Sequence, residues 1–124
     1  MTRYRHVIEI LDTAIGGPNA SIGVHGTFWR GLTRDQFVAT KVKLRREEVV
    51  LLVVGKGSDS NLVKALKGQS PFGNDLPKPP PGAKYPRMPY GFDPVPDPDI
   101  GFIEKWIDDR CPEDPFVVAG LRTS

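Results

Sequence analysis

Few side chains in this sequence could do chemistry beyond packing and charge, and His25 is the first of them. It stands in the stretch Ser-Ile-Gly-Val-His-Gly at 21–26, just after a turn-rich Gly-Gly-Pro-Asn-Ala segment. A neutral imidazole is a good metal ligand and an acid–base group near neutral pH. Neither His25 nor His6 has a cysteine or an obvious serine partner in a recognised catalytic frame. We therefore expect no enzyme activity and name no catalytic residue.

Cysteine and charge exclude several other classes of protein. The one cysteine, Cys111, cannot form an internal disulfide, and no cysteine pair exists to hold zinc. The formal net charge is only +2, and basic residues have acids nearby, as in Arg-Arg-Glu-Glu at 45–48, so we expect no nucleic-acid partner. The N-terminal segment lacks the apolar core of a signal peptide, and no stretch is apolar enough to span a membrane. A cytoplasmic location is the resulting expectation.

The elements that must position these residues are predicted to be mainly helices. An apolar stripe predicts a helix over 4–15, and the Thr33–Gln36 capping box begins another that should run to about Val42. The apolar run at 48–54 indicates an extended segment or a strand, and capping residues followed by Gly68 predict a short helix near 60–67. With 124 residues, we expect a single all-α domain over 1–124, with one short extended segment near 48–54.

The last predicted helix, near 98–110, has the clearest buried face. Asp97 is expected to cap it and Pro98 to occupy its first position. Ile103 and Trp106 lie on the stripe that should pack against the helix at 4–15. Gly101 is costly in a helix, and a close crossing of the two backbones would explain it.

A proline-rich stretch separates these helices. Ten of the thirteen prolines lie between 71 and 98, which predicts an irregular loop over about 70–97. Because long loops are often functional, and tyrosine and arginine are enriched in binding hot spots, we predict a surface for a protein partner there. Its residues would be Tyr85, Arg87, Tyr90 and Phe92. The alternative is that these aromatic side chains only cap the core.

Two stretches carry a resemblance to a known family. They are Gly-Lys-Gly-Ser-Asp-Ser-Asn-Leu-Val-Lys-Ala-Leu-Lys-Gly at 55–68 and the segment from Pro86 to Pro112, which contains Met-Pro and Ile-Glu-Lys-Trp-Ile-Asp. With the order of the helices, they resemble the class I cytochrome c domain, in particular the planctomycete-type bacterial proteins. The resemblance covers roughly residues 4–112 and implies an all-α cytochrome c-like fold.

The resemblance gives the histidine stretch a frame. In the family, Cys-x-x-Cys-His attaches haem through two thioether bonds, and a later methionine is the second axial ligand of the iron. The cysteine positions fall on Ser21 and Val24, the histidine on His25 and the methionine on Met88. A thioether needs a thiol, so covalent attachment is excluded at this site.

Two main interpretations follow from the resemblance. In the first, the chain is a haem-less accessory or protein-binding module with no cofactor; His25 and Met88 are then structural, and Phe28 and Trp29 fill at least part of the former haem pocket. In the second, it is an electron-transfer protein that holds haem non-covalently, with His25 and Met88 as iron ligands. A third, weaker interpretation is a small-molecule binder that uses the former haem pocket.

Overall fold

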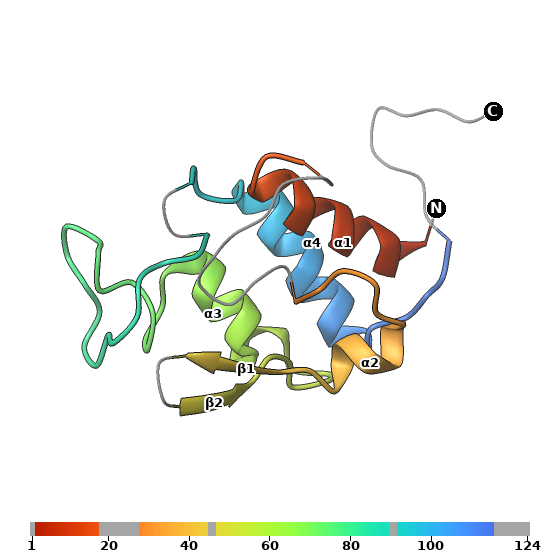
Figure 1. Cartoon of the computed structure of the whole chain (residues 1–124), viewed down its shortest axis with the longest axis horizontal. Helices are drawn as coiled ribbons and strands as arrows, with labels where there is room; N and C mark the ends of the chain where they lie inside the picture. The colour runs from red at the N-terminus through yellow and green to blue at the C-terminus, as the bar shows by residue number, and fades with distance from the viewer. Residues whose placement is uncertain (1, 18–27, 45–46, 90–91, 116–124) are drawn as a thin grey trace.

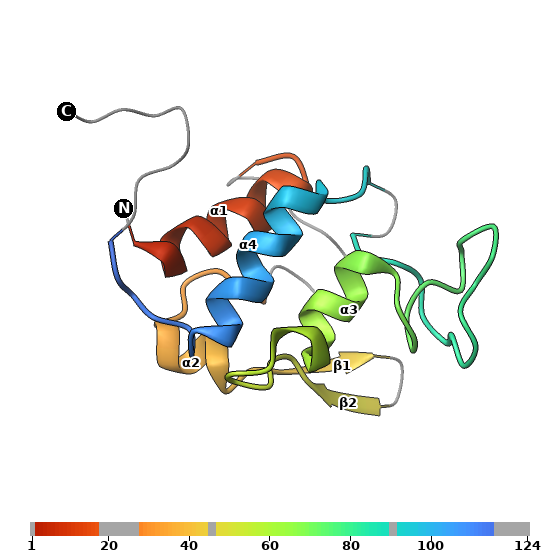
Figure 2. The same cartoon turned by 180° about the vertical axis from the view of Figure 1, so that it is seen from behind.

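The computed structural model describes residues 2–17, 28–44, 47–89 and 92–115 (Figures 1 and 2). Its elements, in chain order, are α1 (Arg3–Ala14), α2 (Arg34–Val38), β1 (Lys41–Leu44), β2 (Glu47–Val50), the 3-10 helix η1 (Gly57–Asp59), α3 (Asn61–Lys67) and α4 (Asp97–Asp108).

Helices α1 and α4 pack against each other, and α4 lies between α1 and α3 (Figures 1 and 2). Val7 on α1 and both Ile103 and Trp106 on α4 are fully buried. The rings of Tyr4 and Trp106 stack across this contact, with centroids 5.9 Å apart and an interplanar angle of 23°. The prediction that the helix near 4–15 packs against the helix near 98–110 through Ile103 and Trp106 is confirmed.

The predicted all-α fold class is wrong, because the chain also contains an antiparallel two-stranded sheet. β1 pairs with β2 in a register that places Lys41 opposite Val50. The helix expected to run to Val42 ends at Val38 instead. Ala39 is its C-cap, and the Thr40 hydroxyl donates back to the carbonyl of Gln36 at 2.8 Å. The following Lys-Val-Lys-Leu alternates in polarity, a pattern that suits a half-buried strand better than a helix.

The helix expected near 60–67 is confirmed as α3, which ends at Gly68 with a left-handed φ of 71°. Glycine adopts this conformation without the steric cost that other residues meet, so it ends the helix. Leu62 and Leu66 are buried on the inner face of α3. The capping box of Thr33 and Gln36 is also confirmed, with both reciprocal hydrogen bonds present.

The start of α4 differs from the prediction in two details. Its N-cap is Pro96, with no side-chain cap, so Asp97 is the first helical residue rather than the cap. Gly101 is exposed, and a Cβ built there meets nothing within 4 Å. The close crossing predicted at Gly101 is therefore wrong. Gly57 is the position where backbone approaches α4 closely, since a Cβ there would lie 2.7 Å from Glu104 Cγ.

The described parts of the proline-rich loop contain no helix, and most of that segment projects from the helices (Figure 1). Phe72 and Tyr85 form an isolated parallel bridge, and the amide of Tyr85 donates to the Pro71 carbonyl at 3.0 Å. The amide of Met88 donates to the Ala65 carbonyl on α3 at 2.9 Å, so the loop returns to the body of the molecule there. Within the described ranges, the longest helices are too short or too polar to cross a membrane.

Candidate functional site

A mostly apolar cavity of about 900 Å³ lies between α1, the β-hairpin, α3 and the proline-rich loop. Leu11 and Ile15 line it from α1, Val42 from β1, and Leu62 and Leu66 from α3. Its volume is at the upper end of the range of small-molecule sites. The cavity is partly open to solvent. A closed void of this size would cost about 20 kcal/mol at about 24 cal/mol per Å³, which exceeds the stability of a typical domain.

Trp29 forms one wall of the cavity, and polar contacts fix its position. Its Nε1 donates to Asp12 Oδ1 on α1 at 2.7 Å, and the side chain is 4% exposed. The same carboxylate oxygen accepts from Arg30 Nε at 2.8 Å, and Arg30 also donates to the Gly17 carbonyl. The ring of Phe28 packs edge-on against Trp29, with centroids 5.1 Å apart. Phe28 and Trp29, which were predicted to fill the pocket, therefore form part of its wall.

Another part of the wall comes from the proline-rich loop. Tyr85 is buried, its ring lies 5.6 Å from that of Phe72, and its hydroxyl donates to Glu47 Oε2 at 2.9 Å. That hydrogen bond, aided by the Lys84 ammonium, holds the pKa of Glu47 below its usual value. Glu47 begins β2, so this contact joins the loop to the hairpin across one side of the cavity.

Of the two predicted haem ligands, Met88 lies within the described residues and His25 does not. Met88 is partly buried and lines the cavity. His25, together with Ser21 and Val24, lies outside the described residues. The two ligand assignments therefore remain a prediction. Of the two side chains, the structure describes the position of the Met88 thioether.

The predicted partner-binding residues fall in different environments. Tyr85 is buried on the cavity wall, whereas Phe92 is 41% exposed and also lines the cavity. Arg87 is half-buried, and its amide donates to Asp75 Oδ1 at 2.8 Å. Tyr90 lies outside the described residues. A partner surface on this loop remains a prediction.

Sequence reasoning missed the contribution of the hairpin to the site. Lys41 and Lys43 are exposed and line the cavity on either side of buried Val42. The alternation of polar and apolar residues over 41–44 was the available signal for a strand there. The capping box at 33–36 fixes where α2 begins but not where it ends, and we extended that helix too far.

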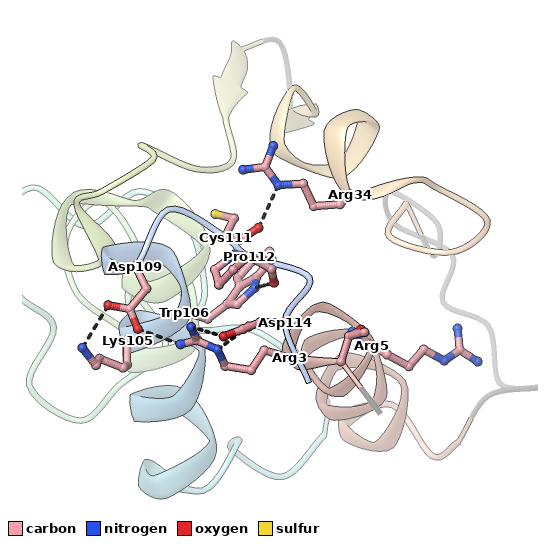
Figure 3. A network of polar contacts seen from close by, with 10 residues as sticks. Arg3, Arg5, Arg34, Lys105, Trp106, Asp109, Cys111, Pro112 and Asp114 are labelled. Atoms are coloured by element: carbon pink, nitrogen blue, oxygen red, sulfur yellow. Dashed lines mark hydrogen bonds and ion pairs between the residues drawn. The ribbon is translucent and has the colours of Figure 1, made fainter. Parts of the chain in front are cut away.

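A cluster of polar groups lies where the N-terminal end of α1 meets the C-terminal end of α4 (Figure 3). Arg3 pairs with Asp109 at 2.6 Å and with Asp114 at 2.8 Å, and these contacts lower the pKa of both carboxyl groups. Nearby, Arg34 Nε donates to the carbonyl of Cys111 at 2.7 Å. Burial raises the pKa of the Cys111 thiol to about 11. A protonated, buried thiol is a poor nucleophile.

Among the described residues, no three histidine, cysteine, aspartate or glutamate side chains gather in a way that could hold a metal ion. No family model, curated protein or solved structure matches the chain.

Proposed function

We propose that this chain is a non-enzymatic binding module, without covalently attached haem, whose cavity takes a bulky apolar molecule. The observation that carries the proposal is the apolar cavity of about 900 Å³, with walls held by hydrogen bonds. Such a concave, mostly apolar and largely preformed site is typical of small-molecule binding. The Asp12–Trp29 and Tyr85–Glu47 contacts supply the preformed walls.

Titration with the neutral apolar fluorophore Nile red tests this proposal. We expect saturable binding with a blue-shifted emission. Ala14 lines the cavity, so Ala14→Phe should fill part of it and weaken binding about tenfold or more. Ala39 is exposed and outside the cavity, so Ala39→Phe is the matched control and should bind like the wild type. Absence of saturable binding to the folded wild type, or equal effects of the two variants, would refute the proposal.

A second candidate is non-covalent haem, and the position of Met88 on the cavity wall favours it. The apolar lining and the thioether suit a haem, which His25 and Met88 would hold. When bound, haem would supply one-electron transfer. Our first proposal predicts no specific Soret band on haemin titration or after expression with ample haem. A saturable band that is lost in His25→Ala and shifted in Met88→Ala would favour the second candidate instead.

An accessory role implies a protein partner. We propose that this partner is cytoplasmic and binds the proline-rich loop. The proposal draws on Phe92, which is 41% exposed, because aromatic side chains are enriched in protein–protein interfaces. Phe92→Ser should weaken co-purification of a native partner without lowering the melting temperature. Exposed Val53 is not a cavity residue, so Val53→Ser should leave co-purification unchanged.

A further inference from the structure

The register of the hairpin fixes which backbone groups of β1 point outward. The amide of Leu51 donates to the carbonyl of Thr40 at 3.2 Å, just outside the paired strands. Antiparallel pairs alternate between hydrogen-bonded and non-hydrogen-bonded, so the pair formed by Val42 is bonded and those formed by Lys41 and Lys43 are not. The amides and carbonyls of the two lysines therefore point away from β2, at the outer edge of β1.

These outward backbone groups are not paired within the described part of the chain. Outside the β1–β2 ladder, no hydrogen bond to the amide or carbonyl of Lys41 or Lys43 is present among the described residues. The outer edge of β2 differs, because Asn61 Nδ2 donates to the carbonyl of Val50 there at 2.7 Å. An unpaired strand edge is a template for pairing with another chain. β1 thus offers two donors and two acceptors with the spacing of a strand.

The cavity extends to this unpaired edge. Of the described residues of β2, Val49 alone lines the cavity, and its side chain shares a face with that of Val42. On β1, three consecutive residues line it, Lys41, Val42 and Lys43. The two lysine side chains project from the opposite face of the hairpin, so the lysines border the cavity through their backbone at the edge.

We infer that the ligand is an extended peptide segment, which adds to the outer edge of β1 as an antiparallel strand and places alternate apolar side chains in the cavity. This inference rests on the proposed function and names its ligand. In strand addition, main-chain hydrogen bonds provide affinity and pockets for alternate side chains provide specificity. A peptide satisfies both the edge and the hollow, whereas a small apolar molecule would fill the hollow alone.

The size of the cavity suits such a segment. Its volume of about 900 Å³ is several times the roughly 150 Å³ of a protein cavity that holds one benzene molecule. Side chains two residues apart on a strand lie on one face, with Cα atoms roughly 7 Å apart. Two bulky apolar side chains of one added strand can therefore enter together. The antiparallel direction is the more stable per residue.

Displacement of Nile red by the neutral peptide acetyl-Ser-Phe-Ser-Phe-Ser-amide tests the inference on the wild type. In an antiparallel addition with both phenylalanines in the cavity, the serine amides point at β1 and the phenylalanine amides point away from it. N-methylation of two serine amides should weaken displacement about tenfold or more, because it removes two hydrogen bonds. N-methylation of both phenylalanine amides adds the same two methyl groups and should leave displacement within about twofold. Equal effects of the two modifications, or a loss confined to the phenylalanine set, would overturn the inference.

A proline at the edge tests the same contact from the side of the protein. Lys43→Pro removes one outward amide hydrogen and spares the ladder, since proline is tolerated on an edge strand where the amide faces outward. It should weaken peptide binding about two- to tenfold, the range for one lost hydrogen bond, and leave Nile red affinity unchanged. Glu48→Pro makes the same change at the outer edge of β2, and Lys43→Gln removes the charge but keeps the amide. Both control variants should bind the peptide like the wild type.

The two proposals fail separately. If Nile red binds but the peptide does not displace it, or if Lys43→Pro and Glu48→Pro have equal effects, the inference fails and the proposed function stands. If Nile red itself does not bind the folded wild type, the proposed function fails. The methylated peptides need no variant, so they decide the inference even where Lys43→Pro does not fold.

Discussion

The indole of Trp29 donates to the carboxylate of Asp12 at 2.7 Å, and this bond joins the wall of the cavity to α1. The Asp12 carboxylate also accepts from Arg30, whose guanidinium lies 5.8 Å from the centroid of the Trp29 ring. One acid thus holds two side chains of the segment that follows residue 27. The orientation of Trp29 therefore depends on Asp12, a residue that does not itself line the cavity.

Asp12→Ala should therefore reduce both stability and binding. Removal of the acceptor leaves the Trp29 N–H and the Arg30 guanidinium without that partner, which costs about 1.5–3 kcal/mol for hydrogen bonds to a charged group. Chemical denaturation measures this loss, and Nile red titration should show weaker binding because the wall is less ordered. Asp35 is an exposed acid on α2, and Asp35→Ala should change neither quantity by a comparable amount. A stable Asp12→Ala variant with full binding would contradict the role of this contact.

Two glycine substitutions should have opposite effects on stability. Gly101 is exposed within α4 and a Cβ there meets nothing, so Gly101→Ala should stabilise the protein by about 0.5–1 kcal/mol. Gly57 faces the backbone and side chain of Glu104, so Gly57→Ala should destabilise it by about 1–3 kcal/mol. Thermal and urea unfolding of the two variants checks both signs. A stability loss in Gly101→Ala would indicate a close contact that the described structure does not contain.

The sequence predicted where the helices lie, apart from the end of α2, because the signals for them are local. The apolar stripe of α1, the box at Thr33 and Gln36 and the final Gly68 each define an element through neighbours a few residues apart. The hairpin could not be settled in this way, since pairing of Lys41 with Val50 is a tertiary choice that competes with helix propensity. Gly101 was misinterpreted for a related reason: a glycine does not reveal whether its neighbour is backbone or water.

The cavity is even harder to predict from a sequence pattern than the hairpin is. Its walls come from Leu11, Trp29, Leu62 and Tyr85, which are separated in the chain and meet only in the folded state. Local patterns mark each of these residues as buried or aromatic. They do not show that the side chains leave a hollow between them, because that depends on how the elements are spaced.

Stability should fall in acid through the Arg3 ion pairs. The Arg3 guanidinium lowers the pKa of Asp109 and Asp114 in the folded state. A depressed pKa contributes stability that is present above the unfolded value of about 3.9 and is lost as the pH falls through the folded value. The melting temperature should therefore drop between about pH 5 and pH 2. Arg3→Gln should lower it at pH 7 and flatten this part of the profile.

A matched comparison isolates these contacts from general acid sensitivity. Arg5 is exposed and lies two residues after Arg3 on the same helix, and no ion pair to it is present among the described residues. Arg5→Gln removes the same charge and should leave the acid limb of the profile as steep as in the wild type. Equal flattening by both variants would assign the effect to net charge instead of the Arg3 pairs.

Trp106 should contribute more to stability than any other single side chain of the core. It is fully buried between α1 and the segment that follows α4, and its Nε1 donates to the Pro112 carbonyl at 2.8 Å. Trp106→Ala should cost about 3–5 kcal/mol through lost burial and a cavity. Trp106→Phe keeps the six-membered ring but leaves the partly buried Pro112 carbonyl without that donor, so a smaller loss of about 1–3 kcal/mol is expected. Urea denaturation of the two variants measures both losses of stability. A loss below about 1 kcal/mol in Trp106→Ala would contradict the packing of α1 on α4 described here.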